Sequence, residues 1–327
     1  MLVDEIKDMK QSDATDGAIL VTGIGGLIGS ALVRKLLALG RPIVGMDIKP
    51  GVDYPFPVLA HNLPDPHRWH EVLTRYKISK IVHAGGVSGP MLYRDAPGTV
   101  VDINLAGLMG LLEAVRIHGG IKRLVWMSSI TAYGDRQDRQ QPVVEDSVLR
   151  PTSVYGGTKA AGEAMVEAYC NDYGLNAVSL RVASCYGPGR TTTCLIRKLL
   201  EDGLAKRVSV IKNAPDITRQ FVYVDDVVDG IIRALDMPSH QHKVYNIAPG
   251  RSQSLAEIVQ AIQLAVPEAN VIERDDGFFG GAYCLGPLSI EAASKDLGFM
   301  PSTPLSEGVL QTLHWVKQQA IASKEFS

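Results

Sequence analysis

Short apolar segments alternate with longer amphipathic segments over the first half of the chain. Six apolar runs predict β-strands, at residues 18–21, 43–46, 58–60, 81–84, 122–127 and 177–182. Apolar residues at helical spacing predict four intervening helices, at residues 30–39, 66–76, 95–118 and 155–173. Strands and helices that alternate at short intervals indicate parallel strands with crossover helices. The pattern therefore predicts an α/β protein whose ligands bind beyond the carboxyl ends of the strands.

A glycine-rich turn joins the first predicted strand to the first predicted helix. Residues 22–29 have the sequence TGIGGLIG. Gly23 permits a tight turn, Gly26 lets the backbone approach a pyrophosphate, and Gly29 allows the helix to pack close to the strand. The N-terminus of the following helix offers unpaired N–H groups to phosphates. This arrangement predicts a Rossmann-type, doubly wound parallel sheet that binds a dinucleotide.

An acidic residue at the end of the second strand indicates which dinucleotide is bound. Asp47 lies 21 residues after Gly26, the offset at which a carboxylate accepts hydrogen bonds from ribose hydroxyls. A carboxylate there repels a 2′-phosphate, and no arginine follows it directly. NAD is therefore the predicted cofactor, although nearby Lys49 leaves NADP open.

The alternation becomes irregular after residue 184, which predicts two domains. We expect an NAD-binding domain at residues 18–183 and a smaller α/β domain, mainly for substrate binding, at residues 184–327. Later strands are expected at 208–211, 221–224 and 244–247, and later helices at 191–201, 226–235, 255–266 and 306–320. Residues 1–17 are predicted to be a disordered tail, and the glycine-rich residues 275–286 a mobile loop.

Composition narrows the class of protein. The 327 residues carry a formal net charge of −2, which is unlike a basic nucleic-acid-binding footprint. No apolar run approaches the ~20 residues that span a membrane. The four cysteines have no paired spacing, so reduced thiols in a cytoplasmic protein are expected. No metal site is expected, because no Cys or acidic cluster accompanies the histidines at 61, 67 and 70.

Tyr155 and Lys159 carry the predicted chemistry. They lie four residues apart on one predicted helix, so their side chains share a face. A tyrosine with an ordinary pKa near ~10 can act as a base near neutrality when an adjacent ammonium and an oxidised nicotinamide lower that pKa. Ser129, at the end of the fifth strand, can orient a substrate hydroxyl beside the phenol. The three residues predict a hydride-transfer site with Tyr155 as acid/base.

The ordered set of motifs resembles the extended short-chain dehydrogenases/reductases, in the branch of NAD-dependent epimerases and dehydratases that includes UDP-galactose 4-epimerase. Residues 22–29 resemble the TGxxGxxG turn of that family, and residues 155–159 (YGGTK) resemble its YxxxK motif. The remaining matches follow in order: Ser128-Ser129 with Tyr133-Gly134, Leu180-Arg181, Tyr186-Gly187-Pro188, RQFVYVDD at residues 219–226, and YNI at residues 245–247.

The resemblance assigns roles position by position. Ser129, Tyr155 and Lys159 are the implied catalytic residues. Residues from the turn and the strand ends are predicted to bind the cofactor: Gly23, Gly26, Leu27, Ile28, Gly29, Asp47, Asn62, Leu63, Ala84, Gly85, Gly86, Asn104, Ser128, Tyr155, Lys159 and Val182. Residues beyond the nicotinamide are predicted to contact the substrate: Ser88, Ser129, Ser184, Arg190 and Arg219.

Two departures from the family pattern concern the substrate. Nucleotide-sugar epimerases usually have an asparagine at the position of Ser184, where it contacts the substrate diphosphate. The small-residue segment at 85–90 has the unusual sequence GGVSGP. Arg219 stands where epimerases place a phosphate-binding arginine, but an arginine grips a carboxylate equally well. The departures weaken the argument for a nucleotide handle on the substrate.

These observations leave three functional hypotheses. The leading one is an NAD-dependent oxidoreductase that oxidises a secondary hydroxyl of a sugar or sugar-derived acid. The alternative is a UDP-sugar 4-epimerase with tightly held NAD, in which the hydride returns to the other face of a keto intermediate. A non-catalytic NAD-binding regulator is a third hypothesis, against which the presence of both Tyr155 and Lys159 argues. The resemblance also implies a homodimer formed through the helices at 95–118 and 155–173.

Overall fold

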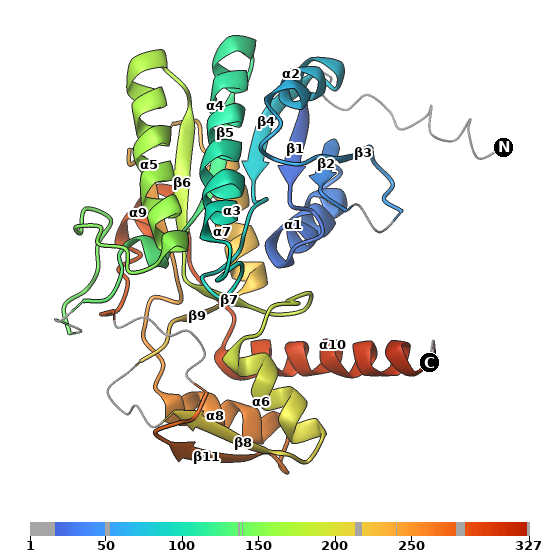
Figure 1. Cartoon of the computed structure of the whole chain (residues 1–327), viewed down its shortest axis with the longest axis vertical. Coiled ribbons are helices and arrows are strands. Elements are labelled where there is room, and N and C mark those ends of the chain that lie inside the picture. The colour runs from blue at the N-terminus through green and yellow to red at the C-terminus, as the bar shows by residue number, and fades with distance from the viewer. Residues whose placement is uncertain are drawn as a thin grey trace.

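The computed structural model describes residues 17–49, 53–136, 138, 140–212, 218–239, 241–278 and 285–325 (Figure 1). The predicted tail, except for Gly17, and residues 279–284 of the predicted loop lie outside the described residues.

A seven-stranded parallel sheet forms the larger part of the molecule (Figure 1). Its order is β10-β6-β5-β4-β1-β2-β3. The strands are β1 (Ala18–Thr22), β2 (Ile43–Asp47), β3 (Val58–Ala60), β4 (Ile78–His83), β5 (Arg123–Ser129), β6 (Ala177–Val182) and β10 (Val244–Ile247). The order changes direction at β1, because β2 and β3 lie on one side of it and β4 on the other. This confirms the predicted Rossmann-type, doubly wound sheet.

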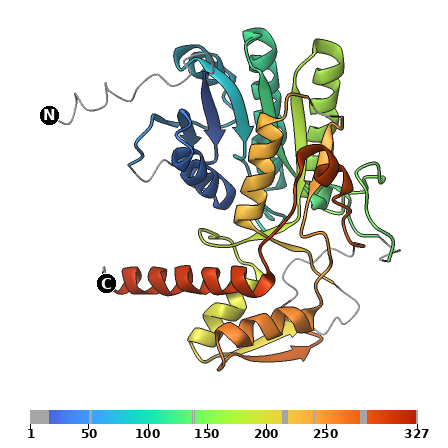
Figure 2. The ribbon, with the colours of Figure 1, turned by 180° about the vertical axis from the view of Figure 1, so that it is seen from behind.

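Helices cover both faces of the sheet. One face packs against α2 (Pro66–Arg75), α4 (Gly107–His118) and α5 (Val154–Tyr173), which stand in front in Figure 1. The other face packs against α1 (Leu27–Ala38) and α7 (Val224–Asp236), which Figure 2 shows from behind. Neighbouring residues of β1 enter different cores, since Ile19 and Val21 face the α1 side and Leu20 faces the α4 side. Burial on both faces explains why these strands are continuous apolar runs.

A smaller part lies beyond the carboxyl ends of the strands (Figures 1 and 2). It contains α6 (Leu195–Leu204), β8 (Val208–Lys212), α8 (Leu255–Ala265) and β11 (Asn270–Arg274), with α10 (Leu305–Glu325) packed against α6 and α8. Strands β8 and β11 pair in parallel, and β7 (Ser184–Tyr186) pairs with β9 (Phe221–Tyr223) between the two parts. After β9 the chain returns to the sheet as α7 and β10, and α9 (Glu291–Leu297) packs beside β10. The chain therefore crosses between the two parts more than once, and the predicted domain boundary at residue 184 stays a prediction.

The helix predicted at residues 95–118 is continuous in space but not in its hydrogen bonding. It consists of α3 (Pro97–Val101), a π-helical turn at Asp102–Ala106, and α4. A π-helical turn inserts an extra residue into the helical ladder and is frequent at functional sites. Here it carries Asn104, which holds one wall of the ligand cavity.

Candidate functional site

A cavity of about 590 Å³ opens at the carboxyl ends of the strands. It is lined by residues at the carboxyl ends of β1, β2, β3, β4, β5 and β6, and on its far side by residues 190–192, Cys194 and Phe221. Because all of these strands are parallel, their carboxyl ends meet at one edge of the sheet, at the point where the strand order reverses. One continuous cavity therefore brings together residues that are more than 150 positions apart in the sequence.

The glycine turn forms one wall of the cavity and leaves no room for side chains. Gly23 adopts a φ of +70°, which L-residues rarely adopt. A Cβ atom on Gly29 would lie 2.0 Å from the carbonyl oxygen of Gly23. The first turn of α1 contains no acidic residue and lines the cavity, so the positive end of the helix dipole favours an anion there. This wall is suited to bind phosphate.

Asp47 is held in place at the same end of the cavity. Its Oδ2 accepts a hydrogen bond from the backbone N–H of Gly25 at 3.0 Å, and its Oδ1 accepts one from the N–H of Lys49 at 3.2 Å. The carboxylate retains lone pairs for hydroxyl groups in the cavity. Asn62 and Leu63, predicted to lie near an adenine, line the cavity at this end.

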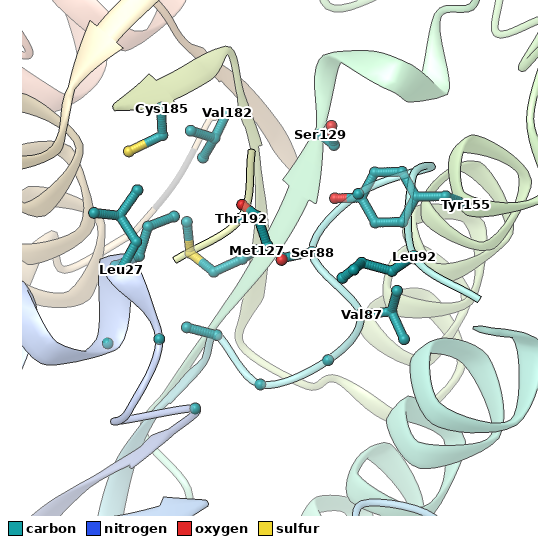
Figure 3. A pocket seen from close by; sticks show the side chains of 18 of the residues that line it. Leu27, Val87, Ser88, Leu92, Met127, Ser129, Tyr155, Val182, Cys185 and Thr192 are labelled. Carbon is teal, nitrogen blue, oxygen red and sulfur yellow. The ribbon is translucent and has the colours of Figure 1, made fainter. Parts of the chain in front are cut away.

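Tyr155 and Ser129 lie across the cavity from the glycine turn. Ser129 ends β5, and its Oγ accepts a hydrogen bond from the N–H of Thr131 at 3.2 Å. Ser153 caps the N-terminus of α5, because its side chain accepts a hydrogen bond from Gly156 N–H at 3.0 Å. This cap fixes the first turn, which carries Tyr155. Figure 3 shows the phenol hydroxyl directed into the cavity, into which Ser129 and Ser88 also project.

Lys159 lies one turn further along α5, at the floor of the cavity. Its ammonium donates a hydrogen bond to the carbonyl oxygen of Met127 at 2.7 Å and lies 4.9 Å from the centre of the Trp126 ring. Burial lowers the pKa of Lys159 to about 8, against the opposing effect of Glu163. The side chain is therefore mostly protonated at neutral pH. The ammonium also lies 5.8 Å from the centre of the Tyr155 ring, so it places a buried positive charge beside the phenol.

Asn104 does not itself line the cavity. Its Oδ1 accepts a hydrogen bond from Val87 N–H at 2.7 Å, and its Nδ2 donates to Val87 O at 3.3 Å and to Thr158 Oγ1 at 3.2 Å. It thus holds the segment after β4, where Gly86 adopts a φ of +140° and a Cβ would meet Asn104 Oδ1 at 2.8 Å. The structure gives Asn104 contacts that shape the wall, and its predicted direct contact with the cofactor stays a prediction.

The five predicted substrate residues are not all in one place. Ser88, Ser129, Ser184 and Arg190 line the cavity. The Arg190 guanidinium donates hydrogen bonds to the carbonyl oxygens of Cys185 and Thr192, which fixes it against the wall. Arg219 is not among the described residues that line the cavity. Its backbone pairs with that of Gln253 through hydrogen bonds of 2.8 and 2.7 Å, so its predicted substrate contact stays a prediction.

Comparison with known proteins identifies the family. Residues 19–248, well over half of the chain, match the model of the NAD dependent epimerase/dehydratase family. The chain belongs to the NAD dependent epimerase/dehydratase family. Its membership confirms the resemblance found in the motifs of the glycine turn and of residues 155–159.

Individual members of the family cover nearly the whole chain. The chain is 29% identical to UDP-glucose 4-epimerase of Mycolicibacterium smegmatis, over 92% of this chain and 99% of that protein. It is 26% identical to UDP-glucuronate 4-epimerase 4 of Arabidopsis thaliana, over 91% of this chain and 74% of that protein. The solved structure of MoeE5 in complex with UDP-glucuronic acid and NAD superimposes with a TM-score of 0.83 at 27% identity, covering 93% of this chain and 100% of that one.

NAD is the cofactor of this family member, and the cavity fits it. A Cβ atom on Gly29 would clash with the backbone of the glycine turn, and the N-terminus of α1 forms part of the same cavity wall. Asp47 is oriented by two backbone N–H groups and has lone pairs for ribose hydroxyls. Of the residues predicted to bind the cofactor, all except Asn104 line the cavity.

Several residues that line the cavity have no signal in the sequence. They come from the segment after Ser88 and from the segment before α6: Met91, Leu92, Tyr93, Thr191, Thr192 and Cys194. The glycines at 85, 86 and 89 indicate a loop, but its course across the cavity depends on Asn104. Thr192 and Leu92 project into the cavity in Figure 3, and neither lies in a motif that the family pattern singles out.

No helix in the described part of the chain has both the length and the apolar character that a membrane span requires. The predicted homodimer through α4 and α5 stays a prediction.

Proposed function

We propose that this protein is a UDP-sugar 4-epimerase. The observation that carries the proposal is one cavity in which Ser129, Tyr155 and Lys159 face the glycine turn, in a chain that aligns over more than nine-tenths of its length with UDP-sugar 4-epimerases. The comparisons support this alternative better than the leading prediction of a sugar dehydrogenase. The structure of MoeE5 with UDP-glucuronic acid and NAD supports a nucleotide sugar as the second ligand.

The residues of this chain supply binding and proton transfer. NAD, when bound along the glycine turn, supplies reversible oxidation of one alcohol carbon. Tyr155 takes the proton from the sugar hydroxyl and later returns it, and Ser129 orients that hydroxyl. Lys159 stabilises the phenolate through its charge and holds the nicotinamide ribose. Burial of Tyr155 and Ser129, each 8% exposed, keeps bulk water from the exchanged proton.

Epimerisation requires more of the pocket than oxidation does. The oxidised sugar must turn its other face toward the nicotinamide before it is reduced again. The pocket therefore has to hold the nucleotide part of the substrate and leave the sugar ring free to turn. Arg190, Thr192 and Phe221 line the same cavity from segments outside the central sheet. We infer that the nucleotide part is held there.

A sugar dehydrogenase is the second candidate, and Ser184 favours it. Ser184 lines the cavity at the position where nucleotide-sugar epimerases usually have an asparagine for the diphosphate. A serine has one short hydroxyl and reaches less far than an amide. A free sugar or sugar acid has no diphosphate and needs no such contact.

The two candidates are separated by one set of incubations. Purified protein with NAD is given UDP-glucose, UDP-galactose, UDP-glucuronic acid or UDP-galacturonic acid, and separately a panel of free aldoses, aldonates and uronates. Proton NMR follows the configuration at C4, and absorbance at 340 nm follows NADH. Inversion of a UDP-sugar without net NADH is the expected result. Steady NADH formation with a free sugar or acid, and no inversion, would replace the epimerase with a dehydrogenase.

Tyr155→Phe is the control that links either activity to this site. The variant keeps the ring and its packing but removes the hydroxyl that exchanges the proton. We expect it to bind NAD and to lose both activities. Normal turnover in this variant would contradict the site assignment, whichever substrate is used.

A further inference from the structure

An ion pair is buried directly behind the wall of the cavity. The Nη2 atom of Arg181 lies 2.6 Å from Oε2 of Glu163, and their side chains are 5% and 4% exposed. The Nε atom of Arg181 also donates to both carboxylate oxygens, at 2.9 and 3.0 Å. A buried pair of this kind seldom adds net stability, because removing two charges from water costs about as much as their attraction returns. Net stabilisation of the fold therefore does not explain why this ion pair is buried beside the cavity.

The pair ties the helix that carries Tyr155 to the ends of two strands. Glu163 lies on α5, Arg181 lies on β6, and Ser128 at the end of β5 donates its hydroxyl to Oε1 of Glu163. Arg181 also donates to the hydroxyl of Tyr133 at 2.7 Å. Every partner comes from a different segment, so the network fixes how far α5 can slide along β5.

Glu163 lies four residues after Lys159, on the same face of α5. Lys159 and Arg181 carry two positive charges and Glu163 one negative charge, so the three side chains together have a net charge of +1. Lys159 donates its hydrogen bond to a carbonyl oxygen, and among the described residues no carboxylate forms an ion pair with it.

The other titratable groups that face Lys159 supply no negative charge while Tyr155 is protonated. His83 on β4 is neutral, because burial lowers its pKa to about 3. Tyr155 on α5 places its ring 5.8 Å from the ammonium. Arg181 on β6 is positive and paired with Glu163. The carboxylate of Glu163 is therefore the negative charge that opposes the effect of burial on Lys159.

We propose that Glu163 is a positioning residue of the NAD site: clamped by Arg181 and Ser128, it fixes the turn of α5 that carries Lys159 and places a buried negative charge one helical turn from the amine. Glu163 does not line the cavity and touches no ligand; it acts through Lys159. Ser128 connects the clamp to the wall itself, because it lines the cavity beside Ser129. The inference rests on the proposed contact of Lys159 with the cofactor, and it does not depend on which sugar is the substrate.

The test is the pH dependence of NADH affinity, measured by calorimetry between pH 6 and pH 10 without any sugar. NADH is chosen because its nicotinamide ring has no positive charge to oppose the ammonium. In the wild-type protein, affinity falls roughly three- to tenfold as Lys159 loses its proton near pH 8, because a charge-assisted hydrogen bond becomes a neutral one. In Glu163→Gln the midpoint of this fall moves to lower pH by roughly one to two units, which is the effect of one charge ~6–10 Å away at an effective dielectric constant of about 20.

Matched variants separate this role from general damage. Glu113→Gln removes an exposed glutamate that pairs with Arg116 on α4, and its midpoint should equal that of the wild type. Lys159→Met should show no fall at all. Glu163→Asp keeps the charge and should restore a midpoint close to that of the wild type. A purely structural role for Glu163 would lower affinity equally at every pH.

Glu163→Gln leaves Arg181 buried without its partner, which can prevent folding. The double variant Glu163→Gln/Arg181→Met removes both charges and should fold with a midpoint shifted in the same direction, by a smaller amount. A folded single or double variant with the wild-type midpoint would overturn the role of Glu163. A wild-type profile in Lys159→Met would instead refute the contact of Lys159 with the cofactor, and the inference with it.

Discussion

A single added methyl group at Gly29 should disable the cofactor site. Gly29 lies in the first turn of α1, and its backbone passes directly over the carbonyl group of Gly23. A Cβ atom in Gly29→Ala would lie 2.0 Å from Gly23 O and 2.7 Å from Gly23 C. Real Cβ atoms stay at least 3.0 Å from such neighbours, so the turn and the helix must separate by about 1 Å. No flexible side chain is available to move instead, because both contacts are with backbone.

Two effects of this displacement can be measured. Forcing a methyl group into a packed site costs about 1–3 kcal/mol of folding free energy, which lowers Tm by roughly 1–5 °C in a protein of this size. The displaced N–H groups of α1 lose one or two charge-assisted hydrogen bonds to phosphate, so NAD affinity falls roughly 10- to 100-fold or more. Affinity should therefore suffer more than stability.

Calorimetric titration with NAD and thermal unfolding by circular dichroism are the assays. Gly98→Ala is the matched control, because a Cβ there meets no heavy atom within 4 Å and the position lies in α3. The control should gain up to about 1 kcal/mol of stability and keep its NAD affinity. If Gly29→Ala bound NAD within twofold of the wild type, the close approach of helix and turn would not be what the cofactor requires, and the reasoning would be wrong.

Three further predictions test other parts of the site. Tyr155→Phe should lower turnover roughly 100- to 10,000-fold, the usual contribution of acid–base catalysis, with NAD affinity within about threefold of the wild type by calorimetry. Asp47→Asn keeps the shape but removes the charge that repels a 2′-phosphate, so the ratio of NAD to NADP affinity should fall roughly tenfold; an unchanged ratio would contradict the role of the carboxylate. Lys159 has a pKa lowered from 10.5 to about 8, so the folded state resists its protonation and stability rises with pH between these values. The free energy of unfolding of the wild type relative to Lys159→Met should therefore increase by about 3 kcal/mol from pH 8 to pH 10.5 in urea titrations, and a decrease would reverse the sign of the argument.

Features that depend on neighbours along the chain follow from the sequence alone. The turn at residues 22–29 needs glycine for reasons of local backbone geometry, and Gly23 does adopt the positive φ that such a turn requires. Tyr155 and Lys159 share a face because four residues make about one helical turn. The alternation of apolar runs with amphipathic segments predicts the parallel sheet, since strands buried on both faces must be apolar throughout.

Features that depend on distant pairing were decided by the tertiary structure. The short elements β7, β11 and α9 carry too few residues for a periodic signal, and β10 resembles any other apolar run until it pairs with β6. That pairing returns the chain to the sheet, which no local pattern after residue 184 indicates.

The same distinction holds within the site. Spacing identifies Lys159, but its burial and its bond to Met127 O depend on where α5 crosses β5. The pairing of Glu163 with Arg181, 18 residues away, and the absence of Arg219 from the described cavity wall are likewise matters of packing. Sequence spacing determines which side chains share an element, whereas the distances between elements, and with them charge and access, arise only when the sheet and its helices assemble.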